Sequence, residues 1–293
     1  MPKRKNSVED PLKEVLKKAV LLPPVIKSSD APVRRSDWKN RERVLILASR
    51  GVHYRGRHIM KDFLKCLPHS KSESKLDHKK ELHSLCELAE MKNSSKVMFF
   101  EARKKKDLYL WLASITPNGP SIKFLTENIH TSAELKFTGN GLKSSRPLLS
   151  FDSSFDDDNQ PHMKIMKELF VQVFGVPKNH PKSQPFTDKV MNFSFLSNRV
   201  WIRNYQIIDH NGAVVEIGPR ISLQPIKLFS EPFGGVVLWE NSKYISPNTI
   251  RAQLMRSKKS YANKVQSRHE SGLRKEKRIT GSNPIDMTDD VFE

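Results

Sequence analysis

The sequence predicts a mixed α/β (α+β) protein whose folded body has two lobes and is flanked by charged terminal segments. Short apolar runs that suit buried strands alternate with stretches in which apolar residues recur at helical spacing. Turn signals of β-hairpins dominate after residue 189, so one continuous parallel sheet is the less favoured arrangement. Only 37% of the 293 residues are hydrophobic, which indicates that part of the chain lies outside any core.

The first lobe is expected to open with a strand and a helix. Residues 44–48 form a short apolar run between polar flanks, as expected of a buried strand, and residues 97–100 repeat this pattern. A helix is predicted to end at Pro68, because proline cannot continue a helix. The apolar positions of this helix follow the spacing i, i+3, i+4 and i+7: Met60, Phe63, Leu64 and Leu67.

Two more helices are expected in this lobe. The first has Asp77 as its N-cap, and Cys86 on its apolar face is interpreted as a small core residue. The other residues of that face are Leu82, Leu85 and Ala89. The second helix is predicted before a turn at 117–120, from the helical spacing of Leu108, Trp111, Leu112 and Ile115.

The second lobe is expected to follow a linker or exposed loop at residues 151–161, which is rich in aspartate. Apolar spacing predicts a helix over 165–173, and Gly175 and Pro177 end it. Alternating apolar residues and the turns Ser197-Asn198 and Asn211-Gly212 then predict an antiparallel meander. Its strands are expected near 191–195, 201–207 and 214–217.

Both ends of the chain are strongly charged, within a total net charge of +19. Residues 1–43 hold twelve Lys and Arg against six Asp and Glu, and several prolines, so a disordered basic arm is expected over residues 1–42. Residues 249–279 are predicted to form a basic helix that starts near Ser246 and Pro247, and residues 280–293 an acidic tail. A positive excess of this size favours a polyanionic partner.

The chain lacks the sequence motifs of common enzyme classes. It has no P-loop, no dinucleotide-binding glycine motif, no zinc-protease motif and no nucleophile elbow. Two cysteines are too few for a cysteine-based zinc site, and the aspartates between 152 and 158 lack the frame of a calcium loop. We therefore expect a non-enzymatic protein without cofactor, metal or small-molecule substrate. No apolar run has the length of a signal peptide or membrane span, so an intracellular protein with reduced thiols and no membrane partner is expected.

Residues 49–58 carry the strongest positive chemistry in the chain. Directly after the first predicted strand, three arginines, two histidines and one tyrosine are interleaved with Gly51 and Gly56. Arginine presents a planar donor fork to phosphate, glycine lets the backbone approach a ligand, and tyrosine offers a stacking face to an unpaired base. We interpret this pattern as an RNA contact. The alternative is a solvated loop with one arginine in a structural salt bridge.

Three further segments are candidates for contact with an anion. Residues 103–106 form a basic run, which also suits a solvated helix start. Residues 139–145 resemble a phosphate-binding loop loosely: as a turn they can offer backbone N–H groups to an anion, or they are a plain structural turn. The C-terminal helix has a thin apolar stripe among its basic residues, which suits assembly on RNA beside a protein neighbour, an anionic membrane or a charged tail helix.

Nine short motifs occur in order between about residues 43 and 248. They are Ser49-Arg50-Gly51 with Arg57, Leu67-Pro68-His69, Phe99-Phe100-Glu101, Leu108-Tyr109-Leu110-Trp111, Pro117-Asn118-Gly119-Pro120, Thr138-Gly139-Asn140, Lys143-Ser144-Ser145-Arg146-Pro147, Phe174-Gly175-Val176-Pro177 and Glu216-Ile217-Gly218-Pro219-Arg220. With these motifs the chain resembles the Brix-domain ribosome-assembly factors. Each motif alone is weak evidence, whereas the ordered set is specific.

The resemblance implies a Brix domain over residues 43–248, built of two similar α/β halves at about 43–150 and 160–248. Each half would be like the anticodon-binding domain of class IIa aminoacyl-tRNA synthetases. The resemblance further implies a nucleolar, non-enzymatic factor that binds precursor ribosomal RNA in biogenesis of the large (60S) subunit, beside other assembly factors and ribosomal proteins. In the family, the Gly-Pro-Arg segment lies in an RNA-binding-like motif, here residues 216–228, although Ile221 stands where an aromatic residue is expected.

These observations define the residues expected to contact RNA. Nuclear import is expected from the basic run Lys3, Arg4 and Lys5. The alternative to RNA binding by the body is a protein-interaction scaffold in the pre-ribosome, whose tails contact RNA only incidentally. The residues expected to contact RNA are Arg50, Tyr54, Arg55, Arg57, His58, Lys104, Lys105, Lys143, Arg146, Arg220, Arg251, Arg256, Lys258 and Lys259.

Overall fold

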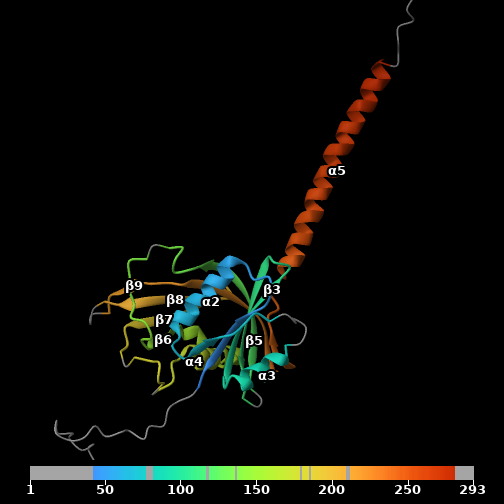
Figure 1. Cartoon of the computed structure of the whole chain (residues 1–293). Helices are drawn as coiled ribbons and strands as arrows, with labels where there is room; N and C mark the ends of the chain where they lie inside the picture. Colours follow the sequence, from blue (N-terminus) through green and yellow to red (C-terminus); the bar gives the residue numbers. More distant parts are fainter. Residues whose placement is uncertain are drawn as a thin grey trace, which may run out of the picture. The chain divides into compact units, whose positions relative to one another are not determined.

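The computed structural model describes residues 42–76, 82–116, 119–135, 137–178, 180–184, 186–208 and 212–280. The basic arm with Lys3, Arg4 and Lys5 lies outside these ranges, as do the acidic tail beyond Thr280, Asp77 and Asn211. Figure 1 shows the described elements coloured along the sequence.

The first half of the body contains five strands and two helices. They are β1 Val44–Ala48, α2 Tyr54–Cys66, β2 Ser70–Ser72, α3 Ser84–Met91, β3 Lys96–Arg103, β4 Asp107–Ser114 and β5 Ser121–His130. The predicted strands at 44–48 and 97–100 are confirmed, and so is the helix that ends at Pro68. The second predicted helix is confirmed as α3, whose Leu85, Cys86 and Ala89 are buried together. Its predicted N-cap, Asp77, is wrong, because α3 begins at Ser84 with His83 at the N-cap position.

The third predicted helix is wrong, because residues 107–114 form strand β4. This strand pairs antiparallel with β3 on one side and with β5 on the other. It is covered on both faces, so Leu110 and Leu112 enter one core cluster while Trp111 and Ala113 enter another. A strand buried on both faces reads as a continuous apolar run, and such a run also satisfies helical spacing.

The second half of the body contains α4 and six strands. The elements are β6 Pro147–Phe151, the 3-10 turn η1 Ser153–Phe155, α4 Pro161–Phe174, β7 Lys189–Leu196, β8 Arg199–Ile207, β9 Val214–Glu216, β10 Arg220–Glu231 and β11 Gly234–Glu240. The predicted helix and meander are confirmed by α4 and by β7, β8 and β9. The predicted aspartate loop is anchored as well as exposed, because Phe155 is fully buried in the core.

All strands of the described residues belong to one eleven-stranded mixed sheet. Its order is β2-β1-β3-β4-β5-β10-β8-β7-β6, with β11 on β10 and β9 on β8. Each half contributes a parallel pair, β1 with β3 or β6 with β7, followed by two antiparallel strands. The two halves therefore repeat one connectivity, and they join where β5 pairs antiparallel with β10.

Helices cover both faces of the sheet (Figure 1). Helices α2 and α4 share one core cluster, in which Phe63 of α2 packs on Phe174 of α4 with ring centroids 5.7 Å apart. Helix α3 packs on the other face, against Leu45, Phe99 and Trp111. The alternation of side chains along β1 and β3 explains this arrangement, because successive residues point to opposite faces.

The chain continues into the helix α5, Pro247–Thr280. Ser246 caps it, since its Oγ accepts a hydrogen bond from the Thr249 N–H at 3.2 Å, and proline occupies the first helical position. The predicted start of the basic C-terminal helix is thereby confirmed.

Candidate nucleic-acid interface

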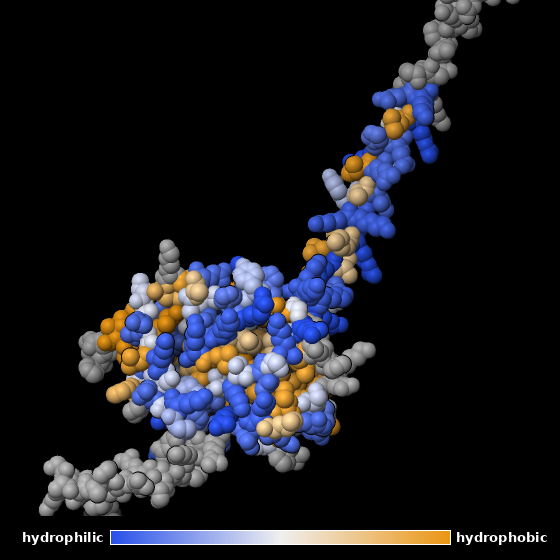
Figure 2. Space-filling model, viewed as in Figure 1, coloured by the Kyte–Doolittle hydropathy of each residue, from blue (hydrophilic) through white to orange (hydrophobic). Residues whose placement is uncertain are grey.

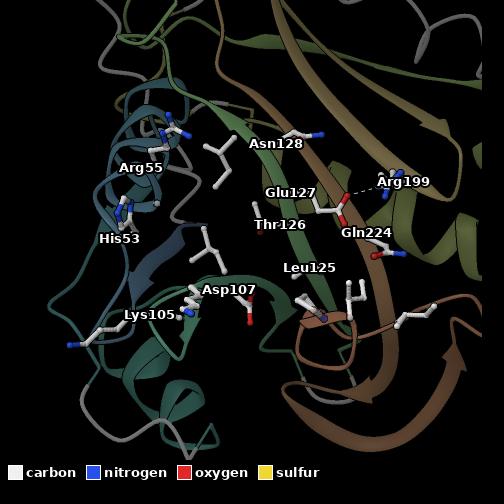
Figure 3. Close-up of a pocket in the computed structure, with 18 of the residues that line it drawn as sticks. His53, Arg55, Lys105, Asp107, Leu125, Thr126, Glu127, Asn128, Arg199 and Gln224 are labelled. Carbon is white, nitrogen blue, oxygen red and sulfur yellow. Dashed lines mark hydrogen bonds and ion pairs between the residues drawn. The ribbon is translucent and has the colours of Figure 1, made fainter. Parts of the chain in front are cut away.

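A cleft of about 700 Å³ opens where four segments of the body meet. These segments are the start of α2, the β3–β4 hairpin, the middle of β5 and the residues that lead into α5. In Figure 3, His53 and Arg55 lie on one side of β5, while Arg199 and Gln224 lie on the other. The cleft thus brings together the basic segment 49–58, the basic run 103–106 and the start of the C-terminal helix.

The loop between β1 and α2 is held close to the sheet by hydrogen bonds. The Ser49 Oγ accepts a bond from the backbone N–H of Ala102 at 2.8 Å, and the Arg50 N–H donates to the Leu76 carbonyl at 3.1 Å. Gly51 adopts φ +87°, a left-handed conformation that favours glycine. The backbone turn therefore presents Arg50 and the residues after it beside the cleft.

Tyr54 supplies an exposed aromatic surface at the start of α2. Its side chain is 52% exposed, and the centroid of its ring lies 4.5 Å from that of His53 and 6.3 Å from that of His58. Unpaired bases stack on exposed aromatic rings with little dependence on sequence. These three rings are the aromatic part of the candidate interface.

Several arginines of the interface already pair with carboxylates. Arg55 lies 3.1 Å from Glu134, and Arg199 lies 2.5 Å from Glu127. The first pair is substantially exposed, and exposed pairs are weak enough for a phosphate to replace the carboxylate. Within the described part of the chain, the cleft lysines without an ion pair are Lys105, Lys106 and Lys243.

The first turn of α5 is fixed to the β3–β4 hairpin. Arg251 donates two hydrogen bonds to the carboxylate of Asp107, at 2.6 and 2.5 Å, and this contact raises the pKa of Arg251 above its usual range. Lys104 donates to the Oδ1 of Asn248 at 3.1 Å. Both basic residues were predicted to contact RNA, and the structure places both at the joint between the body and α5.

Beyond its first turn, α5 is exposed. Figure 2 shows mainly hydrophilic residues along it, with separate hydrophobic ones. Arg256, Lys258 and Lys259 are all exposed, so their side chains are open to a polyanion. The apolar stripe is between 44% and 72% exposed, at Ile250, Leu254, Tyr261, Val265 and Leu273.

The remaining predicted residues lie elsewhere. Arg57 and His58 are exposed on α2 and do not line the cleft. Lys143 lines a second cleft between the two halves, and Arg146 is half-buried beside it in the chain. Arg220 pairs with both carboxylate oxygens of Glu216 and lies 5.4 Å from the ring centre of Phe137, so its contacts are structural.

Sequence reasoning missed several cations of the first cleft. Lys106 belongs to the basic run already noted, and His53 to the basic loop, so both had a local signal. Arg199 and Lys243 had none, because β8 and the chain after β11 reach the cleft only through the pairing of β10.

The described residues contain no group of three or more His, Cys, Asp and Glu side chains placed to hold a metal ion. Among the same residues, no helix combines the length and apolar character needed to cross a membrane.

The chain is similar to known proteins over most of its length. Residues 49–227 match the family model described as the Brix domain. The chain is 51% identical over 263 residues to the human ribosome biogenesis protein BRX1 homolog, covering 89% of this chain and 73% of that protein. It is 48% identical over 252 residues to the Drosophila melanogaster protein of the same name, covering 84% and 70%. A solved probable ribosomal biogenesis protein from Aeropyrum pernix K1 aligns with 67% of this chain and 99% of that chain, at 15% identity and a TM-score of 0.44.

Proposed function

This chain belongs to the Brix-domain family, and we propose that it is a non-enzymatic ribosome biogenesis factor that binds precursor ribosomal RNA of the large (60S) subunit. Relatives that share about half of its residues are named ribosome biogenesis proteins, which supports the general role. A nucleolar location follows from that role. Other assembly factors and ribosomal proteins of the same particle are the expected protein partners.

One observation carries the RNA-binding part of this proposal. Three basic segments that lie far apart in the sequence converge on one cleft, and the exposed Tyr54 stands between the lining residues His53 and Arg55 in the chain. Cations neutralise the phosphates of RNA, while an aromatic ring holds an unpaired base by stacking. The cleft can therefore hold a single-stranded or loop segment of RNA in place without making or breaking bonds.

The scaffold alternative is favoured by a different observation, the exposed apolar stripe of α5. An exposed helix with separate apolar residues suits docking onto a protein neighbour. The two roles make different predictions for crosslinking. Crosslinks to RNA on the body support the RNA-binding role, whereas crosslinks confined to residues 1–43 and 248–279 support the scaffold.

We expect the affinity of the full-length protein for single-stranded RNA to fall steeply as salt rises. Each neutralised phosphate contributes a slope of about −0.7 in a plot of log affinity against log salt concentration, because counterions are released on binding. Fluorescence anisotropy with a labelled RNA, at salt concentrations between about 50 and 200 mM, measures this slope. A flat response would contradict binding by phosphate neutralisation.

The basic loop itself is tested by replacing Arg50, Arg55 and Arg57 with alanine. These side chains are exposed, so the fold should persist while RNA affinity falls about tenfold, the equivalent of about 1.4 kcal/mol. RNA crosslinking to residues 49–58 should fall in parallel.

The matched control removes three exposed or partly exposed lysines outside both clefts, Lys75, Lys92 and Lys178. It loses the same charge, so an equal loss of affinity in both triple variants would show that only net charge matters. Unchanged crosslinking in the arginine variant would mean that the loop faces a protein partner.

A further inference from the structure

A second cleft, of about 750 Å³, lies between the two halves of the body. The end of α2 and strand β2 form one wall, and the loop at residues 141–144, strand β8 and the start of β7 form the other. Five lysines line it, from both halves: Lys65, Lys71, Lys143, Lys182 and Lys189. This is a larger group of cations than either half presents there alone.

The positive charge of this second cleft is not balanced by its own carboxylates. Among the described residues, none of the five lysines forms an ion pair. The one lining carboxylate, Asp62, is 5% exposed and accepts a hydrogen bond from the Ser132 N–H at 2.9 Å. Burial raises the pKa of the Cys66 thiol to about 11, so it adds no negative charge near neutral pH. A concave site of one sign focuses its field on a ligand of the opposite sign.

The loop at residues 139–145 is fixed over this second cleft. Lys189, 6% exposed, donates its ammonium to the Leu142 carbonyl, and the Leu142 N–H donates to Asp188 at 2.6 Å. A Cβ at Gly141 would meet the Cε of Lys189, so a larger residue there would displace the lysine side chain that contacts Leu142. These contacts hold the exposed Lys143 at the second cleft, whose lining also contains Lys65 and Lys71.

We propose that the second cleft binds a phosphate-bearing nucleotide, namely one unpaired nucleotide of the RNA that the protein holds. Lysine ammonium groups are point-charge ligands for phosphate. Leu64 and Ile217, both partly exposed, supply apolar surface for the sugar and base, and the hydroxyls of Ser70, Ser132 and Ser144 supply polar partners. The cleft volume is large enough for a nucleotide and exceeds what a single carboxylate side chain would fill. This inference rests on the proposed RNA-binding function and adds a second contact to it.

The test compares three variants of the full-length chain with wild type. The first changes two exposed lysines of this cleft, K143Q with K182Q. The second keeps their charge, K143R with K182R. The third removes the same charge outside both clefts, K75Q with K178Q. All four sites are exposed, so circular dichroism should show an unchanged fold.

Binding is measured by fluorescence anisotropy with a short labelled single-stranded RNA at several salt concentrations. We expect K143Q with K182Q to bind about tenfold more weakly and to lose about 1.4 from the magnitude of the salt slope, which is about 0.7 for each of two phosphate contacts. The arginine variant and the K75Q with K178Q variant should stay within about twofold of wild type. An equal loss in both glutamine variants, or no loss in either, would overturn the inference.

Amine-reactive labelling of wild type, read by mass spectrometry, identifies the occupant. Protection of Lys143 and Lys182 by RNA, with Lys75 and Lys178 unprotected, supports the proposal. Protection by adenosine monophosphate as well as by RNA assigns the cleft to nucleotide phosphate in general. Protection by poly-glutamate and not by RNA would overturn it in favour of an acidic protein.

Failure here is distinguishable from failure of the proposed function. If wild type binds RNA and the Arg50, Arg55 and Arg57 variant loses affinity while the second-cleft variant does not, only this inference fails. If wild type does not bind RNA at all, the proposed function fails first.

Discussion

A single histidine connects the two halves of the body. His69 directly follows the end of α2 and Pro68, is 2% exposed, and donates its Nε2–H to the Val173 carbonyl near the end of α4, at 3.2 Å. The ring of His180 lies 6.1 Å away. Burial lowers the pKa of His69 to about 4, so the ring is neutral in the folded protein near pH 7.

This histidine should make stability depend on pH. Between pH 6.5 and about 4, the unfolded chain binds a proton at His69 that the folded chain does not bind. Stability is therefore complete above pH 6.5, falls as the pH drops through this range, and has lost roughly 3 kcal/mol below pH 4. Urea unfolding at a series of pH values measures the effect.

The matched comparison uses His69→Gln and His83→Gln, since His83 is exposed. The first variant should show a shallower fall of stability below pH 6.5 than wild type, whereas the second should keep the wild-type slope. Equal slopes in all three proteins would contradict the role given to His69.

The motif Phe99-Phe100-Glu101 is recognisable in the sequence, but its structural role depends on residues of two other strands. Glu101 accepts hydrogen bonds from the Trp111 indole at 2.9 Å and from Lys123 at 3.1 Å, on three neighbouring strands. The Lys123 ammonium lies 4.6 Å from the centre of the Trp111 ring. The motif Phe99-Phe100-Glu101 with Tyr109 to Trp111 therefore stabilises the pairing of neighbouring strands. This role could not be predicted, because the sequence does not show which residues of two strands lie opposite each other.

At the scale of elements, two helical glycines have opposite surroundings. A Cβ at Gly56 in α2 would lie 2.6 Å from a methyl carbon of Val52 and 3.2 Å from one of Leu108, whereas Gly272 in α5 has no neighbour within 4 Å. Helix α2 can therefore approach the β3–β4 hairpin closely only because residue 56 has no side chain.

Alanine at these two positions should change stability in opposite directions. Gly56→Ala overpacks the contact with Val52 and should destabilise the body by about 1–3 kcal/mol. Gly272→Ala removes a flexible residue from an exposed helix and should favour helix formation by about 1 kcal/mol. Chemical denaturation measures the first effect, and ellipticity at 222 nm during heating measures the second. A tolerated Gly56→Ala would contradict the close packing of α2.

The sequence predicted those helices and strands well that have one apolar face and whose pattern depends only on residues close in the chain. Helices α2 and α4 and strands β7 and β8 belong to this class. Strand β10 does not belong to this class. It is central in the sheet and yet contains Pro225, and a proline normally argues against a central strand. The structure accommodates this proline at a register shift between Pro225 and Lys227, opposite β5.

At the scale of the whole molecule, the joint between β5 and β10 makes the two halves dependent on each other. The resemblance implied two similar halves, but not that they share one sheet. The two clefts could not be predicted from the sequence of either half, because basic residues of both halves line them only once β5 pairs with β10.

We expect residues 42–146, made alone, not to reach the native fold. The fragment leaves the edge of β5 without its partner strand, and an open edge favours aggregation. Hydrogen exchange should show that the β5 amides facing β10 lose their protection, and mixing with residues 147–248 should restore it.

As a control, residues 42–252 keep the first turn of α5 with its Arg251–Asp107 contact and should keep their melting temperature, since α5 is exposed beyond that turn. Stable protection of β5 in the isolated fragment would contradict this dependence.

The position of β10 in the chain also has a consequence for biosynthesis. A nascent chain completes β5 long before β10 emerges, because β6 to β9 are translated between them. At roughly 5–20 residues per second, the edge of β5 stays without its partner strand β10 for several seconds. The protein is therefore most prone to misassembly while β6 to β9 are translated. A slower translation of this segment lengthens that period, and a chaperone bound at the tunnel exit would protect the open edge.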